Sequence, residues 1–215
     1  MTKIKICGIT SVELAQAAAH SGADLIGMVF AASRRRIDRA AAKQIGAEAR
    51  SVQKVGVFVN APLNEVRELV RDCRLDLVQL HGDEPPEYCA QVGAPVIKAI
   101  RADISLTAEV FKGHPAEWLL LDSAAAGQFG GTGVPFDWDG LVRLRAELEK
   151  PLFVAGGLNR GNVLRAMRLL KPDGVDVSGG VETDGIKDKI KIAEFIRTVR
   201  EEDRRNAGTD CSPQV

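Results

Sequence analysis

The feature that most constrains this chain is an alternation of short apolar runs with amphipathic segments, repeated along almost its whole length. The apolar runs predict eight strands, over residues 4–7, 25–30, 54–59, 75–80, 95–100, 118–122, 151–155 and 174–178. Several of these runs are nearly continuous in apolar residues, which is typical of strands covered on both faces. The alternation therefore predicts an α/β protein with a parallel sheet.

Helical patterns occupy the segments between the runs. Ser11 is a candidate N-cap and Gly22 a stop signal for the first helix. The other helices are predicted over residues 38–50, from Pro62, from Pro85, around 105–112, from Asp137, and over 160–170 and 187–200.

The number of strand–helix units decides between two architectures. Eight units in 215 residues favour a single-domain (β/α)8 TIM barrel with eight parallel strands over an open doubly wound sheet. We assign residues 1–202 to the barrel domain. Residues 203–215 are polar and predict a frayed C-terminal tail.

Charge and cysteine content narrow the classes of partner. Lys and Arg together number 29, as do Asp and Glu, so no nucleic acid or membrane surface is indicated as a partner. The chain has no transmembrane-length apolar run and no signal-peptide pattern, so we expect a cytoplasmic protein. Its four cysteines lack CxxC spacing, which predicts reduced thiols and no metal site. Composition leaves both a monomer and a homodimer open.

In a barrel of this kind, chemistry belongs at the C-terminal ends of the strands. Alternation along the first strand turns Lys5 and Cys7 toward the barrel interior and Ile4 and Ile6 toward the helices. A thiol at that position can act as a base if a cation such as Lys5 lowers its pKa. The other interpretation is a small buried apolar side chain, the usual role of a free cysteine.

The predicted sixth strand ends in a carboxyl group, that of Asp122. A carboxyl group at the end of an apolar run is costly to bury without a partner. In such surroundings it can keep its proton and act as a general acid. The alternative is that Asp122 caps the turn that follows the strand.

Glycine-rich loops follow three late strands and predict a phosphate site. The loops after the seventh and eighth strands are the stronger candidates, because barrels commonly bind phosphate there on backbone N–H groups. Residues 179–183 could form the short extra helix of such a site. The candidate phosphate residues are Gly156, Gly157, Ser178, Gly179 and Gly180. Gly131, in the third loop, and Lys5 are candidates for other contacts with the substrate.

Three further side chains are candidates for contact with a substrate. Arg35, within the basic run at residues 34–36, could bind a carboxylate, although a solvated basic loop is the common alternative. His81 shares a strand face with Gln79 and is either structural or a supporting residue of the site. Asp176 faces inward and could bind a ribose-type hydroxyl.

In several blocks the sequence resembles the phosphoribosylanthranilate isomerases. The blocks span about the first 200 residues, in order and at the expected strand ends: residues 5–10, 55–60, 78–84, 121–122, 130–133, 136–138, 155–158, 162–163, 176–178, and last 180–182 with 185 and 187–188. The resemblance implies a cofactor-independent Amadori rearrangement of N-(5'-phosphoribosyl)anthranilate, a small phosphorylated substrate. It also implies that Asp122 is the general acid, Cys7 the general base and Arg35 the ligand of the anthranilate carboxylate.

The chain departs from the family pattern at two positions. Arg34 stands where the family usually has proline, and Gly179 stands where it usually has serine. Two rival functions remain open: a ribotide isomerase of histidine synthesis and a non-catalytic barrel that binds a phosphorylated ligand. The ribotide isomerases resemble a solution to the same type of reaction that uses two aspartates, and Cys7 argues against them. A non-catalytic barrel would lack an acid or a base.

Overall fold

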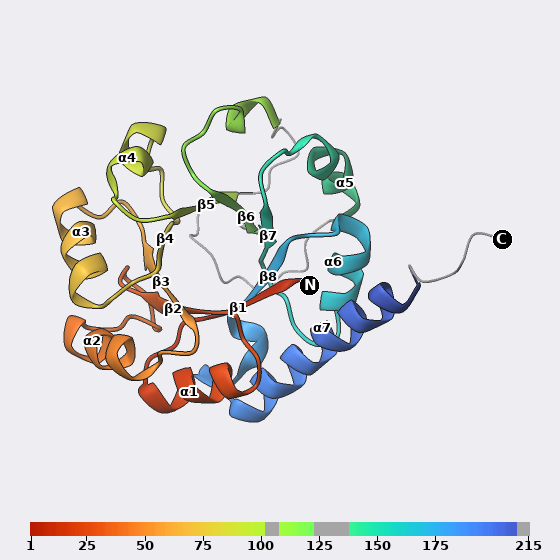
Figure 1. The fold of residues 1–215 in the computed structure, drawn as a ribbon, viewed down its shortest axis with the longest axis horizontal. Helices are drawn as coiled ribbons and strands as arrows, with labels where there is room; N and C mark the ends of the chain where they lie inside the picture. Colours follow the sequence, from red (N-terminus) through yellow and green to blue (C-terminus); the bar gives the residue numbers. More distant parts are fainter. Residues whose placement is uncertain (102–107, 123–137, 210–215) are drawn as a thin grey trace.

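The computed structural model describes residues 1–101, 108–122 and 138–209. Figure 1 shows a ring of strands surrounded by helices. The strands pair in sequence order and close into a barrel, with β1 parallel to β8 through Lys3 opposite Gly174. They are β1 (Lys3–Cys7), β2 (Leu25–Val29), β3 (Gln53–Phe58), β4 (Leu77–Leu80), β5 (Val96–Arg101), β6 (Trp118–Asp122), β7 (Leu152–Val154) and β8 (Gly174–Val177). The predicted barrel is confirmed.

The helices on the outside are α1 (Val12–His20), α2 (Arg39–Glu48), α3 (Leu63–Asp72), α4 (Pro86–Gln91), α5 (Trp138–Glu147), α6 (Val163–Leu170) and α7 (Lys189–Thr209). Ser11 caps α1 as predicted, because its hydroxyl accepts from the Leu14 N–H at 3.3 Å. The helix predicted around residues 105–112 is wrong for its described part, which is a 3-10 turn, η1 (Ala108–Phe111). Gly113 follows that turn with φ of +72°, a conformation that ends a helix.

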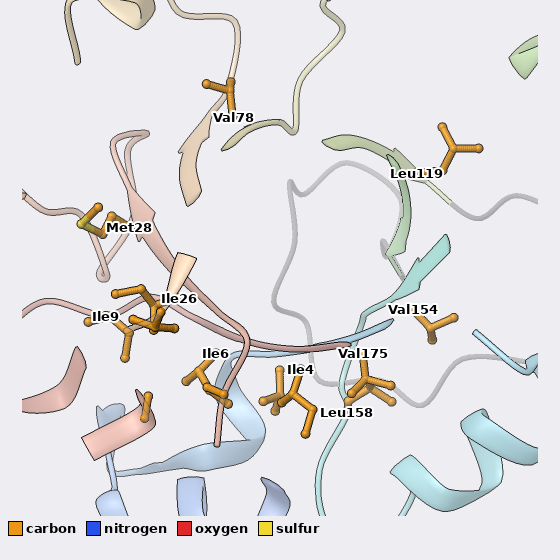
Figure 2. Packing of buried hydrophobic residues seen from close by; sticks show 14 of the residues in the cluster. Ile4, Ile6, Ile9, Ile26, Met28, Val78, Leu119, Val154, Leu158 and Val175 are labelled. Atoms are coloured by element: carbon orange, nitrogen blue, oxygen red, sulfur yellow. The ribbon is translucent and has the colours of Figure 1, made fainter. Parts of the chain in front are cut away.

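Alternation along the strands divides the apolar side chains into two layers. Figure 2 shows Ile4, Ile6 and Val175 pointing away from the barrel interior toward the surrounding helices. A second cluster fills the interior of the barrel: Leu25, Val55, Leu77, Ile97, Ala99, Leu120, Phe153 and Ala155. The predicted orientation of the first strand is therefore confirmed, and the interior is packed below the C-terminal ends of the strands.

Aspartates brace the opposite, N-terminal end of the barrel. Three of them stand just before a strand and accept from a backbone N–H of the preceding strand, each at 2.8 Å: Asp24 from Ile4, Asp76 from Lys54 and Asp173 from Leu152. These carboxylates are used by the backbone itself, so this end stabilises the barrel.

The C-terminal segment differs from its prediction. Residues 203–209 continue α7, so a frayed tail beginning at Asp203 is wrong for them. The Asp203 carboxylate accepts from the N–H of Thr2 at 3.0 Å and from its hydroxyl at 2.7 Å, and Arg200 donates to the Thr2 carbonyl at 2.6 Å. These polar residues therefore hold the N-terminus. Across the described part of the chain, every helix is too short or too polar to cross a membrane.

Candidate active site

A cavity of about 380 Å³ opens at the C-terminal ends of the strands. It is lined by Cys7, Val29, Ala31, Ser33, Arg35, Val57, Val59, Gln79, His81, Asp122, Ala155, Gly156, Gly157, Leu158, Asn159, Asp176, Ser178, Gly179 and Gly180. Most of the residues singled out from the sequence are therefore brought to one place. In particular, the thiol of Cys7 and the carboxyl of Asp122 face the same space from different strands.

Cys7 ends β1 with only 8% of its surface exposed. A Cβ atom at Gly27, the neighbour of Cys7 on β2, would lie 2.8 Å from its sulfur, so glycine makes room for the thiol. Burial raises the pKa of the Cys7 thiol above its ordinary value of 9.0, and the opposing effect of Lys5 is smaller. Lys5 therefore acts in the expected direction on the pKa of Cys7, but burial outweighs it and the pKa is raised overall.

Lys5 explains this result, because its charge is already paired. Its ammonium group is fully buried and lies 3.0 Å from both carboxylate oxygens of Asp176. Burial acts to lower the pKa of Lys5, but Asp176 and Cys7 together raise it, so the ammonium ion is retained. Lys5 faces the interior as predicted, yet it lies beneath the cavity and is not among the lining residues, whereas Asp176 is.

Asp122 ends β6, and its partner comes from β4. Its Oδ2 atom lies 3.1 Å from Nε2 of His81, and Nδ1 of His81 lies 2.8 Å from Nε2 of Gln79. All three residues line the cavity, and Gln79 is only 1% exposed. His81 is thus a direct partner of the predicted acid, and Gln79 is a third member that the sequence analysis did not single out.

Arg35 lies on the β2 side of the cavity and is bound by Glu182. Its Nε and Nη2 atoms donate to the two carboxylate oxygens at 2.6 and 2.9 Å. Lys187 also pairs with Glu182, and Arg34 does so at 2.8 Å. Burial of the Glu182 carboxyl is outweighed by its bonds to Arg35 and Lys187, which lower its pKa to about 2. This bidentate contact uses the edge of the Arg35 guanidinium with Nε and Nη2. Within the described residues Nη1 has no hydrogen-bond partner, so that edge can donate to another anion.

Of the three arginines in the basic run, only Arg35 lines the cavity. The Arg34 side chain is 61% exposed, and Arg36 is exposed as well. The structure therefore selects Arg35 from its neighbours.

Backbone conformation shapes the two glycine loops. Gly156 and Gly157 have φ of +85° and +63°, a left-handed conformation that favours glycine. At Gly180 a Cβ atom would lie 1.9 Å from the carbonyl oxygen of Leu158, so the two loops pack directly against each other. The helix predicted over residues 179–183 is shorter, a 3-10 turn η2 (Gly179–Val181).

The residues after η2 form a small antiparallel hairpin, β9 (Glu182–Thr183) with β10 (Ile186–Lys187). Asp184 and Gly185 form the turn of this hairpin, both with positive φ, so the chain does not continue as a helix after η2. The hairpin returns Lys187 to the loop after β8, where its ammonium donates to the Ser178 carbonyl at 3.2 Å. The Ser178 hydroxyl in turn donates to the Cys7 carbonyl at 3.1 Å, which ties this loop to the end of β1.

Gly131 and its loop at residues 130–133 lie outside the described residues. Within the described ranges, no group of three or more His, Cys, Asp or Glu side chains is arranged to hold a metal ion. No role was predicted from the sequence for Gln79, Glu182 or Lys187. A signal existed for each, since Gln79 shares a strand face with His81, and the other two stand in the last block of resemblance.

Together, the closed barrel and a cavity that holds an acid, a thiol, an arginine and glycine loops define a (β/α)8-barrel enzyme. The family model described as N-(5'phosphoribosyl)anthranilate (PRA) isomerase matches residues 4–198. The chain belongs to this family, as its sequence blocks predict.

Individual relatives agree with the family assignment. A protein from Syntrophomonas wolfei subsp. wolfei named N-(5'-phosphoribosyl)anthranilate isomerase is 48% identical over 204 residues, which cover 94% of this chain and 99% of that protein. The crystal structure of phosphoribosyl anthranilate isomerase from Thermus thermophilus is similar with a TM-score of 0.83 and 35% identity, over 94% of this chain and 100% of that one.

A third similar structure carries a ligand. It is a phosphoribosyl anthranilate isomerase in complex with reduced 1-(o-carboxyphenylamino)-1-deoxyribulose 5-phosphate, with a TM-score of 0.80 and 34% identity over 94% of this chain and 100% of that one.

Proposed function

We propose that this protein converts N-(5'-phosphoribosyl)anthranilate to 1-(2-carboxyphenylamino)-1-deoxyribulose 5-phosphate, an Amadori rearrangement of tryptophan biosynthesis that needs no cofactor. Family membership supports the reaction, and so does the similar structure that holds the reduced form of this product. The observation that carries the proposal is that Cys7 and Asp122 line one cavity with Arg35 and the glycine loops.

Asp122 acts first, as the general acid. Its proton passes to the furanose ring oxygen, and the bond from C1' to that oxygen breaks with its electron pair on the oxygen. The lone pair of the anthranilate nitrogen then forms the C1'=N bond of an iminium ion. His81 lies against Asp122 and can stabilise the carboxylate that remains.

Cys7 acts second, as the general base. Its thiolate removes the C2' hydrogen, and the electrons of that bond form C1'=C2' as the iminium nitrogen becomes neutral. The resulting enolamine tautomerises to the ketose when C1' gains a proton and the C2' hydroxyl loses its own. Burial raises the pKa of Cys7, and the positive iminium ion favours the thiolate at the moment it is needed.

The remaining groups of the cavity match the ends of the substrate. The free edge of the Arg35 guanidinium suits the anthranilate carboxylate. The loops with Gly156, Gly157, Ser178, Gly179 and Gly180 suit the phosphate, through backbone N–H groups. We place the protein in the cytoplasm, without nucleic acid, as a monomer or homodimer.

The test is turnover of freshly prepared phosphoribosylanthranilate, followed as loss of substrate fluorescence. We expect the wild type to turn over and both Cys7→Ser and Asp122→Asn to lose about 10²–10⁴-fold in kcat. Cys89→Ser is the matched control, since Cys89 is a buried thiol in α4 outside the cavity, and it should keep full activity. Binding without turnover by the wild type, or full turnover by either cavity variant, would contradict the proposal.

A further inference from the structure

Gln79 lines the candidate active site and is almost completely buried. It sits on β4 with 1% of its surface exposed, and its Cα is paired in register with that of Ile97 on β5. Its amide nitrogen lies 2.8 Å from Nδ1 of His81. The other ring nitrogen of His81 lies 3.1 Å from Oδ2 of Asp122. The three side chains thus form a line from the barrel interior to the predicted acid.

This arrangement favours one tautomer of His81. With the Gln79 amide oriented so that its nitrogen faces the ring, its N–H donates and Nδ1 accepts with its lone pair. A neutral imidazole that accepts at Nδ1 carries its proton on Nε2, which faces the Asp122 carboxyl. His81 therefore donates to Oδ2 of Asp122.

The amide of Gln79 is used for little else. Among the described residues, its Oε1 atom is buried and has no hydrogen-bond partner. An unsatisfied buried oxygen costs stability, whereas an apolar side chain would pack into this layer of the barrel without that cost. Its contribution is therefore to His81 rather than to the packing of the interior.

We propose that Gln79 is a positioning residue for the acid step. It holds His81 as the Nε2–H tautomer, and His81 then binds Oδ2 of Asp122 so that Oδ1 delivers the proton. When the proton leaves, the carboxylate that forms is already hydrogen-bonded to His81, which stabilises it. This inference rests on the proposed function, because it assigns a role to a group acting on Asp122.

The tautomer can be measured without substrate. The chain has three histidines, so two-dimensional ¹⁵N–¹H correlation spectra of ¹⁵N-histidine protein resolve each ring, and His81→Asn assigns the signal of His81. We expect a protonated Nε2 and an unprotonated Nδ1 in the wild type. Gln79→Glu replaces the donor with an acceptor and should move a proton to Nδ1.

Kinetics test whether the tautomer matters for the reaction. Gln79→Met keeps the size of the side chain and removes its hydrogen bond, so we expect kcat to fall about 10–100-fold with KM within about twofold of the wild type. Ile97→Val is the matched control, because Ile97 is the buried register neighbour of Gln79 and does not line the cavity. It should leave kcat unchanged.

Two results would overturn the proposal: a protonated Nδ1 on His81 in the wild type, or a kcat in Gln79→Met equal to that of Ile97→Val. The wild-type spectrum decides the first point even if a Gln79 variant fails to fold. Failure of the proposed function has a different signature, since the wild type would then show no turnover while its His81 signal still reported the Nε2–H form.

Discussion

The two ends of the barrel use the same residue types for different purposes. Both are hollowed, with a cavity of about 380 Å³ at the C-terminal end and one of about 200 Å³ at the N-terminal end. At the N-terminal end, aspartates accept from the backbone of the neighbouring strand as well as from basic side chains, as Asp76 does from the Lys54 N–H and the Lys54 ammonium. At the C-terminal end, Asp122 and Asp176 face the cavity with partners that are side chains. The strand end at which a carboxylate stands therefore decides whether it braces the fold or is available for chemistry.

The lysine pairs at the two ends differ in the same way. Lys5 and Asp176 are 0% and 8% exposed at their side chains, whereas Asp76, the partner of Lys54, is 40% exposed. Removing one member of a buried ion pair leaves the other charge buried with neither a partner nor water to solvate it. We therefore expect Lys5→Met to lower the free energy of unfolding by about 3–5 kcal/mol.

Lys54→Met is the comparison and should cost less than about 1 kcal/mol, since solvent reaches Asp76. Urea unfolding of both variants at neutral pH measures the difference. Equal losses would show that the two ends are not distinguished by burial.

Glycines at the two ends provide a second comparison. A Cβ atom at Gly27 would lie 2.8 Å from the sulfur of Cys7 and 3.2 Å from the Lys5 ammonium, and one at Gly174 would lie 2.3 Å from the ring of Phe153. Both alanine variants should lose about 1–3 kcal/mol of stability by overpacking. Only Gly27→Ala displaces the predicted base, so its kcat should fall about 10–100-fold.

Steady-state kinetics beside thermal unfolding separate the two effects. The comparison fails if Gly174→Ala loses as much kcat as Gly27→Ala at a temperature where both are folded.

The Glu182 cluster predicts a pH dependence of stability. The pKa of Glu182 is lowered to about 2 from 4.5, so its stabilising effect is complete above pH 4.5 and is lost as the pH falls toward 2. We expect Glu182→Gln to be less stable than the wild type by about 2 kcal/mol at pH 7, a difference that shrinks through this acid range. Urea unfolding at a series of pH values measures it. A difference that is constant from pH 7 to pH 3 would mean that Arg35 and Lys187 do not hold the carboxylate.

The smallest effect should come from the N-terminal end. Asp76→Asn keeps an oxygen that can accept from the Lys54 N–H and loses only the charge, so we expect at most about 1 kcal/mol in stability and no change in kcat. Urea unfolding and turnover under identical conditions provide the measurement. A loss of activity in a stable Asp76→Asn protein would remove the distinction between the two ends.

Strand parity and the position of strand ends account for most of what the sequence could predict. They place Cys7 inward on β1, Asp122 at the end of β6 and Ser178 just after β8, because alternation and strand ends are local properties. The pairing of Arg35 with Glu182 joins residues 147 positions apart through the β9–β10 hairpin, so no local pattern contains it. The raised pKa of Cys7 likewise depends on how Asp176 engages Lys5 and on the depth of burial in the folded barrel.

The division of labour between Cys7 and Asp122 can be tested most directly with substrate carrying deuterium at C2', in single-turnover measurements. If Cys7 removes the C2' hydrogen, turnover by Cys7→Ser is limited by that step and should slow several-fold further with deuterium. If Asp122 opens the ring, ring opening limits turnover by Asp122→Asn and precedes the removal of the C2' hydrogen. The rate of this variant should therefore be nearly the same with deuterium as with hydrogen. The reverse pattern, or the same isotope effect in both variants, would contradict the account.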